Sequence, residues 1–447
     1  VDLGYKMKTS LVENIRSWIR ILTILIISGL VLSLIIYTQA STLILILLTL
    51  SIIVAEILRD FNKDREGIIK KLSIVFSILF LIVSLLSIFN GIGYYNGVKS
   101  ESYSYIPNYY TIQWQEAMSW VRNNTLPNSV FAHWWDYGYW LQSIGNRATV
   151  TDGGNAIVWW NYLTGRLVLT GDNQEDSLNF LWNHNATHLL IDSSDIGKYG
   201  AFAQIGSNAD YDRYSSGPTT MLLNEKQIQE TSNGTFMVYQ GTSCVEDDIN
   251  YNQNNVKIFI PGVTKDKDGN PQCNAFFAGI TLEISNKNNL QKFEQPNVVV
   301  YYKNTPYNFP LRYIYQSGKL YDFKTGLEAT MDIIERAQVS EKGLQINKNG
   351  ATIFISPRVM KGFLGQVYIL NDPLNNFPNF KIVHSEQGYF TSYFNSLGAN
   401  LGEFSYLDNY GGLSGPIKIW EIKYTGNEKI NEDYLTKMPP SNITWKF

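Results

Sequence analysis

The chain has 447 residues, of which 45% are hydrophobic and 14% aromatic, which is enough for about two to four domains with hydrophobic cores. The formal net charge of -3 at pH 7 excludes the strongly basic character typical of a nucleic-acid-binding protein, so no nucleic-acid partner is expected. The composition also changes along the chain, because residues 1–90 contain nearly continuous aliphatic runs and the remainder is polar and rich in Tyr, Asn and Gly.

Three apolar segments near the start of the chain predict membrane-spanning helices. They cover residues 21–37, 42–58 and 72–89, and each is close to the shortest length that crosses the hydrocarbon core of a bilayer. Basic residues precede the first segment and separate the second from the third, which places both basic regions in the cytoplasm. The sequence therefore predicts an integral protein of the cell membrane whose chain after Phe89 is extracytosolic. A buried helical hairpin is the alternative.

The next part of the chain carries mixed helix and strand signals. A helix is predicted from Thr111, because four apolar residues recur at helical spacing on one face: Trp114, Ala117, Met118 and Val121. A strand at 130–132, helices at 137–143, 156–169 and 175–182, a strand at 187–191 and a helix from residue 196 follow in order. Asp136 would lie at the N-terminus of the helix at 137–143.

Beyond about residue 208 the pattern changes to short β-type runs between Gly, Pro and Asn turns. Strands are predicted at 256–260, 298–302, 352–355, 367–370 and 417–424, with a helix at 327–336. The predicted fold class is a membrane α-helical segment of three spans at 1–93, an extracytosolic mixed α/β domain at 94–210 and a β-rich sandwich or barrel-like region at 211–447.

The two cysteines, Cys244 and Cys273, both lie in the region predicted to be extracytosolic. A disulfide is favoured by an oxidising compartment. Two free thiols are the alternative, and the spacing alone does not decide between them.

The most informative motif is the pentapeptide Trp134, Trp135, Asp136, Tyr137 and Gly138. It places two indole N–H donors and one carboxylate acceptor close together, as a site that reads a small polar group requires. A purely structural interpretation is equally open at this point, with a core strand entering a helix that Asp136 caps.

The pentapeptide resembles the WWDYG signature of the catalytic subunit of oligosaccharyltransferase. About sixty residues further on, Asp195 and Lys198 are similar to the D-x-x-K of the second motif of that family, and the intervening segment 145–155 also resembles it. One position departs from the family pattern, because Phe202 stands where the second motif continues with Met or Ile. The resemblance implies that the two motifs together bind the acceptor sequon.

The activity implied by this resemblance is N-linked protein glycosylation by an archaeal-type glycosyltransferase. A glycan would pass from a dolichol-linked oligosaccharide to the Asn of an Asn-X-Ser/Thr sequon, at the lipid bilayer and with Mn²⁺ or Mg²⁺ as cofactor. The acidic loop motifs that hold the metal in the family are absent from the sequence, and the chain begins with Val1. It is therefore expected to be a C-terminal fragment that recognises the acceptor, is inactive alone, and has no catalytic and no metal-binding residue.

The alternative function is a membrane-anchored sugar-binding or envelope surface protein without catalysis. In that case the tryptophans would stack on sugar rings, since exposed aromatic pairs often mark binding surfaces.

Overall fold

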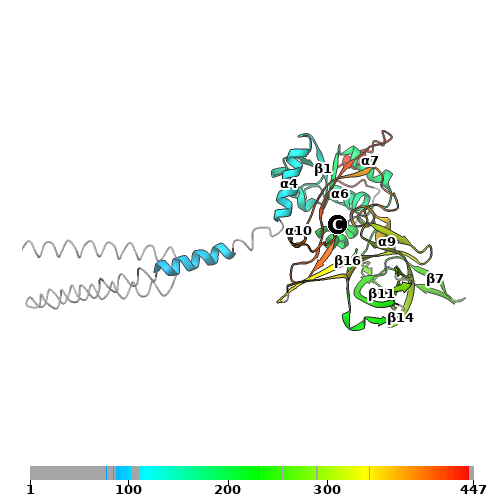
Figure 1. The fold of residues 1–447 in the computed structure, drawn as a ribbon. Helices are drawn as coiled ribbons and strands as arrows, with labels where there is room; N and C mark the ends of the chain where they lie inside the picture. The colour runs from blue at the N-terminus through cyan, green and yellow to red at the C-terminus, as the bar shows by residue number, and fades with distance from the viewer. Residues whose placement is uncertain are drawn as a thin grey trace, which may run out of the picture. The chain divides into compact units, whose positions relative to one another are not determined.

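The computed structural model describes residues 77, 84, 87–101, 110–232, 234–253, 256–287, 290–341 and 343–441. The chain divides into two units, residues 1–109 and 110–447, drawn in Figure 1. Residues 87–101 of the first unit are helical. All other elements below belong to the second unit.

The fold class predicted from the sequence, which begins with three membrane-spanning helices, is wrong for the described residues. None of the helices that the structure describes is both long and apolar enough to cross a bilayer. The longest in the second unit, α4 (Ile112–Asn124), has 13 residues, whereas a span needs about 20. The predicted segments 21–37 and 42–58 lie outside the described residues, as does most of 72–89.

Helix α4 confirms the helix predicted from Thr111. Its buried residues are the four predicted to share a face: Trp114, Ala117, Met118 and Val121. The other helices and helical turns are η1 (Trp135–Tyr137), α5 (Gly138–Ser143), α6 (Val158–Leu163), η2 (Thr164–Leu169), α7 (Gln174–Asn183), α8 (Ser194–Ile205), η3 (Glu225–Gln227), α9 (Pro357–Lys361), η4 (Leu364–Ile369), α10 (Tyr389–Ser396) and α11 (Glu432–Leu435).

A five-stranded sheet carries the signature motif. Its strands follow the order β18-β21-β3-β1-β2, where β1 is parallel to both β2 and β3, and β21 is antiparallel to β3 and β18. The edge strand β18 and its neighbour β21 come from the region beyond residue 211. The sheet therefore joins parts of the chain that are far apart in sequence. The bounds are β1 (Val130–Ala132), β2 (Ala148–Thr149), β3 (His188–Ile191), β18 (Phe380–Glu386) and β21 (Ile417–Ile422).

A larger, mostly antiparallel sheet follows the order β15-β14-β13-β11-β6-β4-β17-β16-β19-β20. A further pairing of β14 with β16 closes part of it into a ring of strands. Strand β12 pairs with β11 and β5 with β6, while β7 with β8 and β9 with β10 form separate hairpins. The bounds are β4 (Thr219–Leu223), β5 (Gln229–Thr231), β6 (Gly234–Cys244), β7 (Ile249–Gln253), β8 (Val256–Ile260), β9 (Thr264–Lys265), β10 (Pro271–Gln272), β11 (Ala275–Lys287), β12 (Leu290–Phe293), β13 (Asn297–Tyr302), β14 (Thr305–Gln316), β15 (Lys319–Asp322), β16 (Leu327–Ser340), β17 (Gly343–Ile355), β19 (Ser405–Leu407) and β20 (Gly412–Ser414).

Two sequence predictions in this region are wrong. The helix predicted at 327–336 is part of strand β16, which pairs with β14, β17 and β19. Pairing on this scale overrides the helix preference of its Leu, Glu, Ala and Met residues. The strand predicted at 367–370 falls largely in η4, where every residue is buried, and a fully buried apolar run has no period that separates helix from strand.

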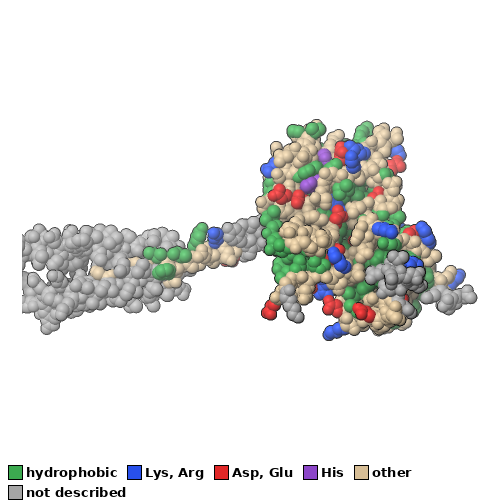
Figure 2. All heavy atoms as spheres, in the orientation of Figure 1, with side chains coloured by type: hydrophobic (Ala, Val, Ile, Leu, Met, Phe, Trp, Pro, Cys, Tyr) green, Lys and Arg blue, Asp and Glu red, His purple; other side chains and the backbone are tan. Residues whose placement is uncertain are grey.

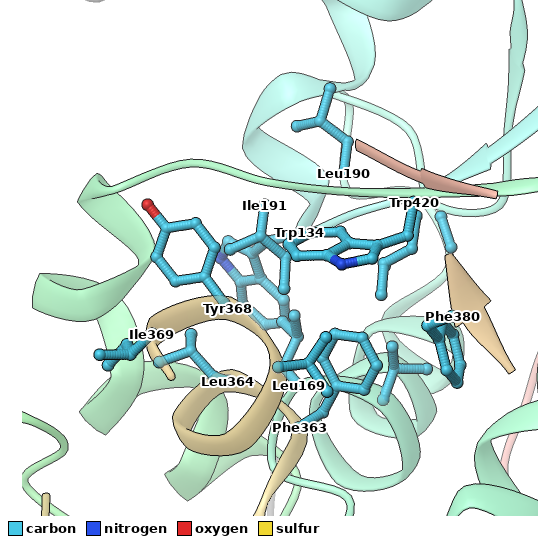
Figure 3. Packing of buried hydrophobic residues seen from close by; sticks show 14 of the residues in the cluster. Trp134, Leu169, Leu190, Ile191, Phe363, Leu364, Tyr368, Ile369, Phe380 and Trp420 are labelled. Atoms are coloured by element: carbon cyan, nitrogen blue, oxygen red, sulfur yellow. The ribbon is translucent and has the colours of Figure 1, made fainter. Parts of the chain in front are cut away.

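One hydrophobic core surrounds the five-stranded sheet and contains buried residues of β1, β3, β21, α8 and η4. Figure 3 shows Trp134 in this core among residues of three elements: Leu190 and Ile191 of β3, Tyr368 of η4 and Trp420 of β21. A second core fills the ring of strands. In Figure 1 the helices α4, α6 and α7 lie near β1 at one end of the unit, and β11 and β14 lie at the other.

The two cysteines form a disulfide that links the end of β6 to the segment just before β11. The disulfide joins two positions that are 29 residues apart. It stabilises the fold because it lowers the conformational entropy of the unfolded chain. We expect Cys244→Ser with Cys273→Ser to lower the free energy of unfolding by about 3 kcal/mol. Urea unfolding followed by fluorescence measures this loss, and a change below about 0.5 kcal/mol would contradict the expectation.

Candidate functional site

Trp134 and Trp135 differ in their surroundings. Trp134 is buried with 3% of its surface exposed, and its ring centroid lies 5.5 Å from that of Phe202 on α8. Trp135 is partly exposed and packs against the edge of the same core. Neither indole N–H donates to another residue within the described part of the chain. The pair therefore provides one buried wall and one accessible edge.

Asp136 contacts the second motif and does not cap a helix. Helix α5 has no side-chain cap, and the carboxylate instead lies 2.6 Å from the Lys198 ammonium, measured from Oδ2 to Nζ. The two side chains are 26% and 32% exposed, so both reach solvent. The structure thus brings together the two motifs that the sequence separates by about sixty residues.

Tyr137 lies at the centre of the contacts between the motifs. Its hydroxyl donates to Oδ1 of Asp195 at 2.8 Å and accepts from Nζ of Lys198 at 3.1 Å. The Ser194 hydroxyl lies 2.9 Å away, and the Lys198 ammonium is also 4.6 Å from the centre of the Tyr137 ring. The tyrosine is buried at 2% exposure, so a single hydroxyl connects a buried carboxylate to an accessible ammonium.

Asp195 is a fully buried carboxyl in the first turn of α8. Its Oδ2 accepts a hydrogen bond from the backbone N–H of Asp192 at 3.1 Å. Burial raises the pKa of Asp195 to about 7; Lys198 acts against this shift, and Asp192 adds to it. Burial likewise raises the pKa of Asp192 and of the Tyr137 hydroxyl, so the inner part of the site strongly disfavours negative charge.

Gly138 holds the signature against the segment at 145–155. A Cβ at this position would lie 2.3 Å from the backbone N of Gly153 and 2.7 Å from the carbonyl carbon of Asp152. In turn, a Cβ on Gly153 would meet the ring of Tyr139 at 2.3 Å. Two backbone segments therefore touch at a position where only glycine fits.

Comparison with known proteins gives the chain a family context. No protein-family model matches it. It is 32% identical over 121 residues to dolichyl-phosphooligosaccharide-protein glycotransferase 1 of Pyrococcus horikoshii and 33% identical over 121 residues to its counterpart in Pyrococcus furiosus. Over this stretch the chain is similar to archaeal dolichyl-phosphooligosaccharide-protein glycotransferases. Each match covers 25% of this chain and 12% of the relative, so the chain spans only a small part of those proteins.

Solved structures of oligosaccharyltransferases are also similar to this chain, among them the two that follow. The C-terminal domain of C. jejuni pglb has a TM-score of 0.33 at 9% identity, covering 70% of this chain and all of that one. The archaeal enzyme AglB from Archaeoglobus fulgidus, in complex with an inhibitory peptide and a dolichol-phosphate, has a TM-score of 0.24 at 18% identity, covering 40% of this chain and 23% of that one. At these scores neither structure adds to the argument from geometry.

His133, which no motif in the sequence singles out, also lies in this region. It is fully buried directly before the signature, its Nδ1 donates to the Trp134 carbonyl at 2.5 Å, and its Nε2 has no partner among the described residues. Burial lowers the pKa of the imidazole to about 4, so the ring is neutral and shapes the backbone. Ser194 and Asp192 were also missed, since short polar residues before a helix are usually caps.

No group of three or more His, Cys, Asp or Glu side chains within the described ranges could hold a metal ion. Figure 2 shows acidic and basic side chains scattered over the face of the second unit that it draws. The site consists of donors, acceptors and one ion pair, which suits recognition of a neutral polar group.

Proposed function

We propose that this chain recognises the acceptor sequon in an oligosaccharyltransferase, which transfers a glycan from a dolichol-linked donor to the Asn of Asn-X-Ser/Thr. The observation that carries the proposal is the 2.6 Å contact between Asp136 of the first motif and Lys198 of the second. Similarity to two archaeal glycotransferases supports the reaction class. The Cys244–Cys273 disulfide is consistent with an extracytosolic site of action.

The hydroxyl two residues after the acceptor Asn is the group that this site would read. Asp136 accepts the hydroxyl proton, and the free indole N–H of Trp135 donates to the hydroxyl oxygen, which uses both hydrogen-bonding capacities of Ser or Thr. The Lys198 ammonium balances the negative charge of the Asp136 carboxylate and fixes the orientation of that side chain. Trp134 and Phe202 form the apolar wall behind it.

Binding at this position orients the acceptor for transfer elsewhere in the enzyme. The Mn²⁺ or Mg²⁺ that the family resemblance implies would be held by residues other than those described, and no step assigned to this chain involves it. The proposed partners are the sequon polypeptide and a dolichol-linked oligosaccharide. Because dolichol is a lipid, the reaction would take place at a bilayer surface.

The test is equilibrium binding of fluorescent peptides to this chain. We expect an Asn-X-Thr peptide to bind at least about tenfold more tightly than the same peptide with Val in place of Thr, because Val has the same shape and leaves Asp136 without its donor. The partial exposure of Asp136 keeps the ratio below that of a dry pocket. Equal affinities for the two peptides would exclude hydroxyl recognition.

A further inference from the structure

The hydroxyl of Tyr137 has three polar neighbours but only one proton, and this fixes the direction of its hydrogen bonds. The Lys198 ammonium can only donate, and an ionised Asp195 can only accept. Tyr137 must therefore give its proton to Asp195 at 2.8 Å and accept from Lys198 at 3.1 Å. The Ser194 hydroxyl at 2.9 Å then donates to the remaining lone pair. The order of donors runs from Lys198 through Tyr137 to Asp195.

Asp195 has a geometry suited to anchoring this chain of hydrogen bonds. It is fully buried, its second oxygen is held by the backbone N–H of Asp192, and it lies in the first turn of α8. Lys198 reaches it only through the tyrosine hydroxyl. A hydroxyl that donates to a carboxylate is polarised and becomes a better acceptor for a second donor, so the charge on Asp195 strengthens the bond from Lys198.

We propose that Asp195 is a positioning residue which acts through Tyr137 to hold the Lys198 ammonium against Asp136, and that peptide recognition requires its ionised form. This inference rests on the proposed function. Asp195 does not touch the acceptor. When it is protonated, its O–H competes with Lys198 for the same tyrosine oxygen, and Lys198 loses the orientation that aligns Asp136.

The proposal predicts opposite pH trends for recognition and stability. The titratable groups facing Asp195 are Asp192, Lys198 and the two neutral tyrosines Tyr137 and Tyr368. The pKa of Asp195 is about 7 instead of 3.8, so Asp195 becomes protonated as the pH drops through 7. We therefore expect kcat/KM for the peptide to fall over that range. The folded state binds the proton more tightly than the unfolded state, so this group stabilises the fold at low pH and that stability is lost as pH rises from about 4 to 7.

The experiment uses the enzyme expressed from its whole gene, with peptide kinetics from pH 5.5 to 9. Tyr137→Phe is expected to raise the peptide KM about tenfold with a smaller change in kcat. Asp195→Asn is expected to remove both the decline in kcat/KM near pH 7 and the matching part of the pH dependence of Tm. Burial also raises the pKa of Glu246 to about 7. Because Glu246 is present in both the original enzyme and Asp195→Asn, its titration contributes equally to the two pH profiles.

Tyr139→Phe is the matched control, because Tyr139 is 60% exposed and its hydroxyl has no partner among the described residues. It should keep KM within about twofold of the original enzyme. The positioning role is overturned if Tyr137→Phe behaves like Tyr139→Phe, or if folded Asp195→Asn keeps the pH profile. Asp136→Ala distinguishes failure of the proposed function from failure of the positioning role. An unchanged peptide KM in Asp136→Ala overturns the proposed function itself. A raised KM in Asp136→Ala together with an unchanged KM in Tyr137→Phe overturns only the positioning role of Asp195.

Discussion

Asp136→Ala is expected to lower kcat/KM for an Asn-X-Thr peptide by roughly ten- to a hundredfold in the enzyme expressed from its whole gene, as loss of a hydrogen bond to a charged group costs about 1.5 to 3 kcal/mol. The substitution removes the proposed hydroxyl acceptor and also leaves the Lys198 ammonium without its 2.6 Å partner. Lys198→Ala should cost less, because Asp136 keeps its acceptor oxygens. Affinity for the dolichol-linked donor should change little.

Steady-state kinetics with Asn-X-Thr and Asn-X-Ser peptides measures this effect. Asp212→Ala is the matched control, since it removes the carboxylate of another partly exposed ion pair, formed with Arg166 at 2.7 Å between side chains that are 33% and 24% exposed. That variant should retain peptide kinetics. Full activity of Asp136→Ala together with continued rejection of Asn-X-Val would show that another residue reads the hydroxyl.

Gly138→Ala is expected to destabilise the second unit by about 4 kcal/mol or more, which is far above the typical effect of one added methyl group. The new Cβ would meet three backbone atoms within 3 Å: the N of Gly153 and the carbonyl and Cα carbons of Asp152. Backbone atoms cannot turn aside as a flexible side chain does, so the two segments must separate. Urea unfolding and the retention of peptide binding provide the two measurements.

Gly197→Ala makes the same chemical change at a helical glycine on the other side of the site. A Cβ at Gly197 has nothing within 4 Å, and alanine favours a helix over glycine by up to about 1 kcal/mol. This variant should be as stable as the original protein or more so. If both substitutions have equal effects, the contact between the signature and Gly153 is not what requires glycine at position 138.

The sequence predicted the elements that depend on local pattern. The apolar spacing of α4 and the short strand β1 were predicted and are confirmed, because one buried face leaves a clear period. The resemblance to a family brought Asp136 and Lys198 into one site, and their contact agrees with it. The position of Tyr137 between Lys198 and Asp195 could not be inferred from spacing, because an acid and a base three residues apart on one helix ordinarily pair directly.

What the sequence could not supply depends on distant parts of the chain. The run at 327–336 is a strand because β14, β17 and β19 pair with it, and nothing local reveals those partners. The Cys244–Cys273 bond was one of two open alternatives and depends on the β6 and β11 pairing. Asp136 was predicted to lie at a helix N-terminus as a cap, whereas its carboxylate pairs with Lys198 of the distant helix α8.

The place of β21 in the five-stranded sheet has a consequence for synthesis of the protein. Trp420 lies opposite Leu189, and the strand sits between β18 and β3, so β3 has an open edge until residues 417–422 have left the ribosome. The nascent chain therefore carries both motifs long before it can close the sheet beneath them. A polypeptide that stops short of β21 would leave the edge of β3 unpaired beside the apolar residues Leu189, Leu190 and Ile191, and such exposed edges favour aggregation.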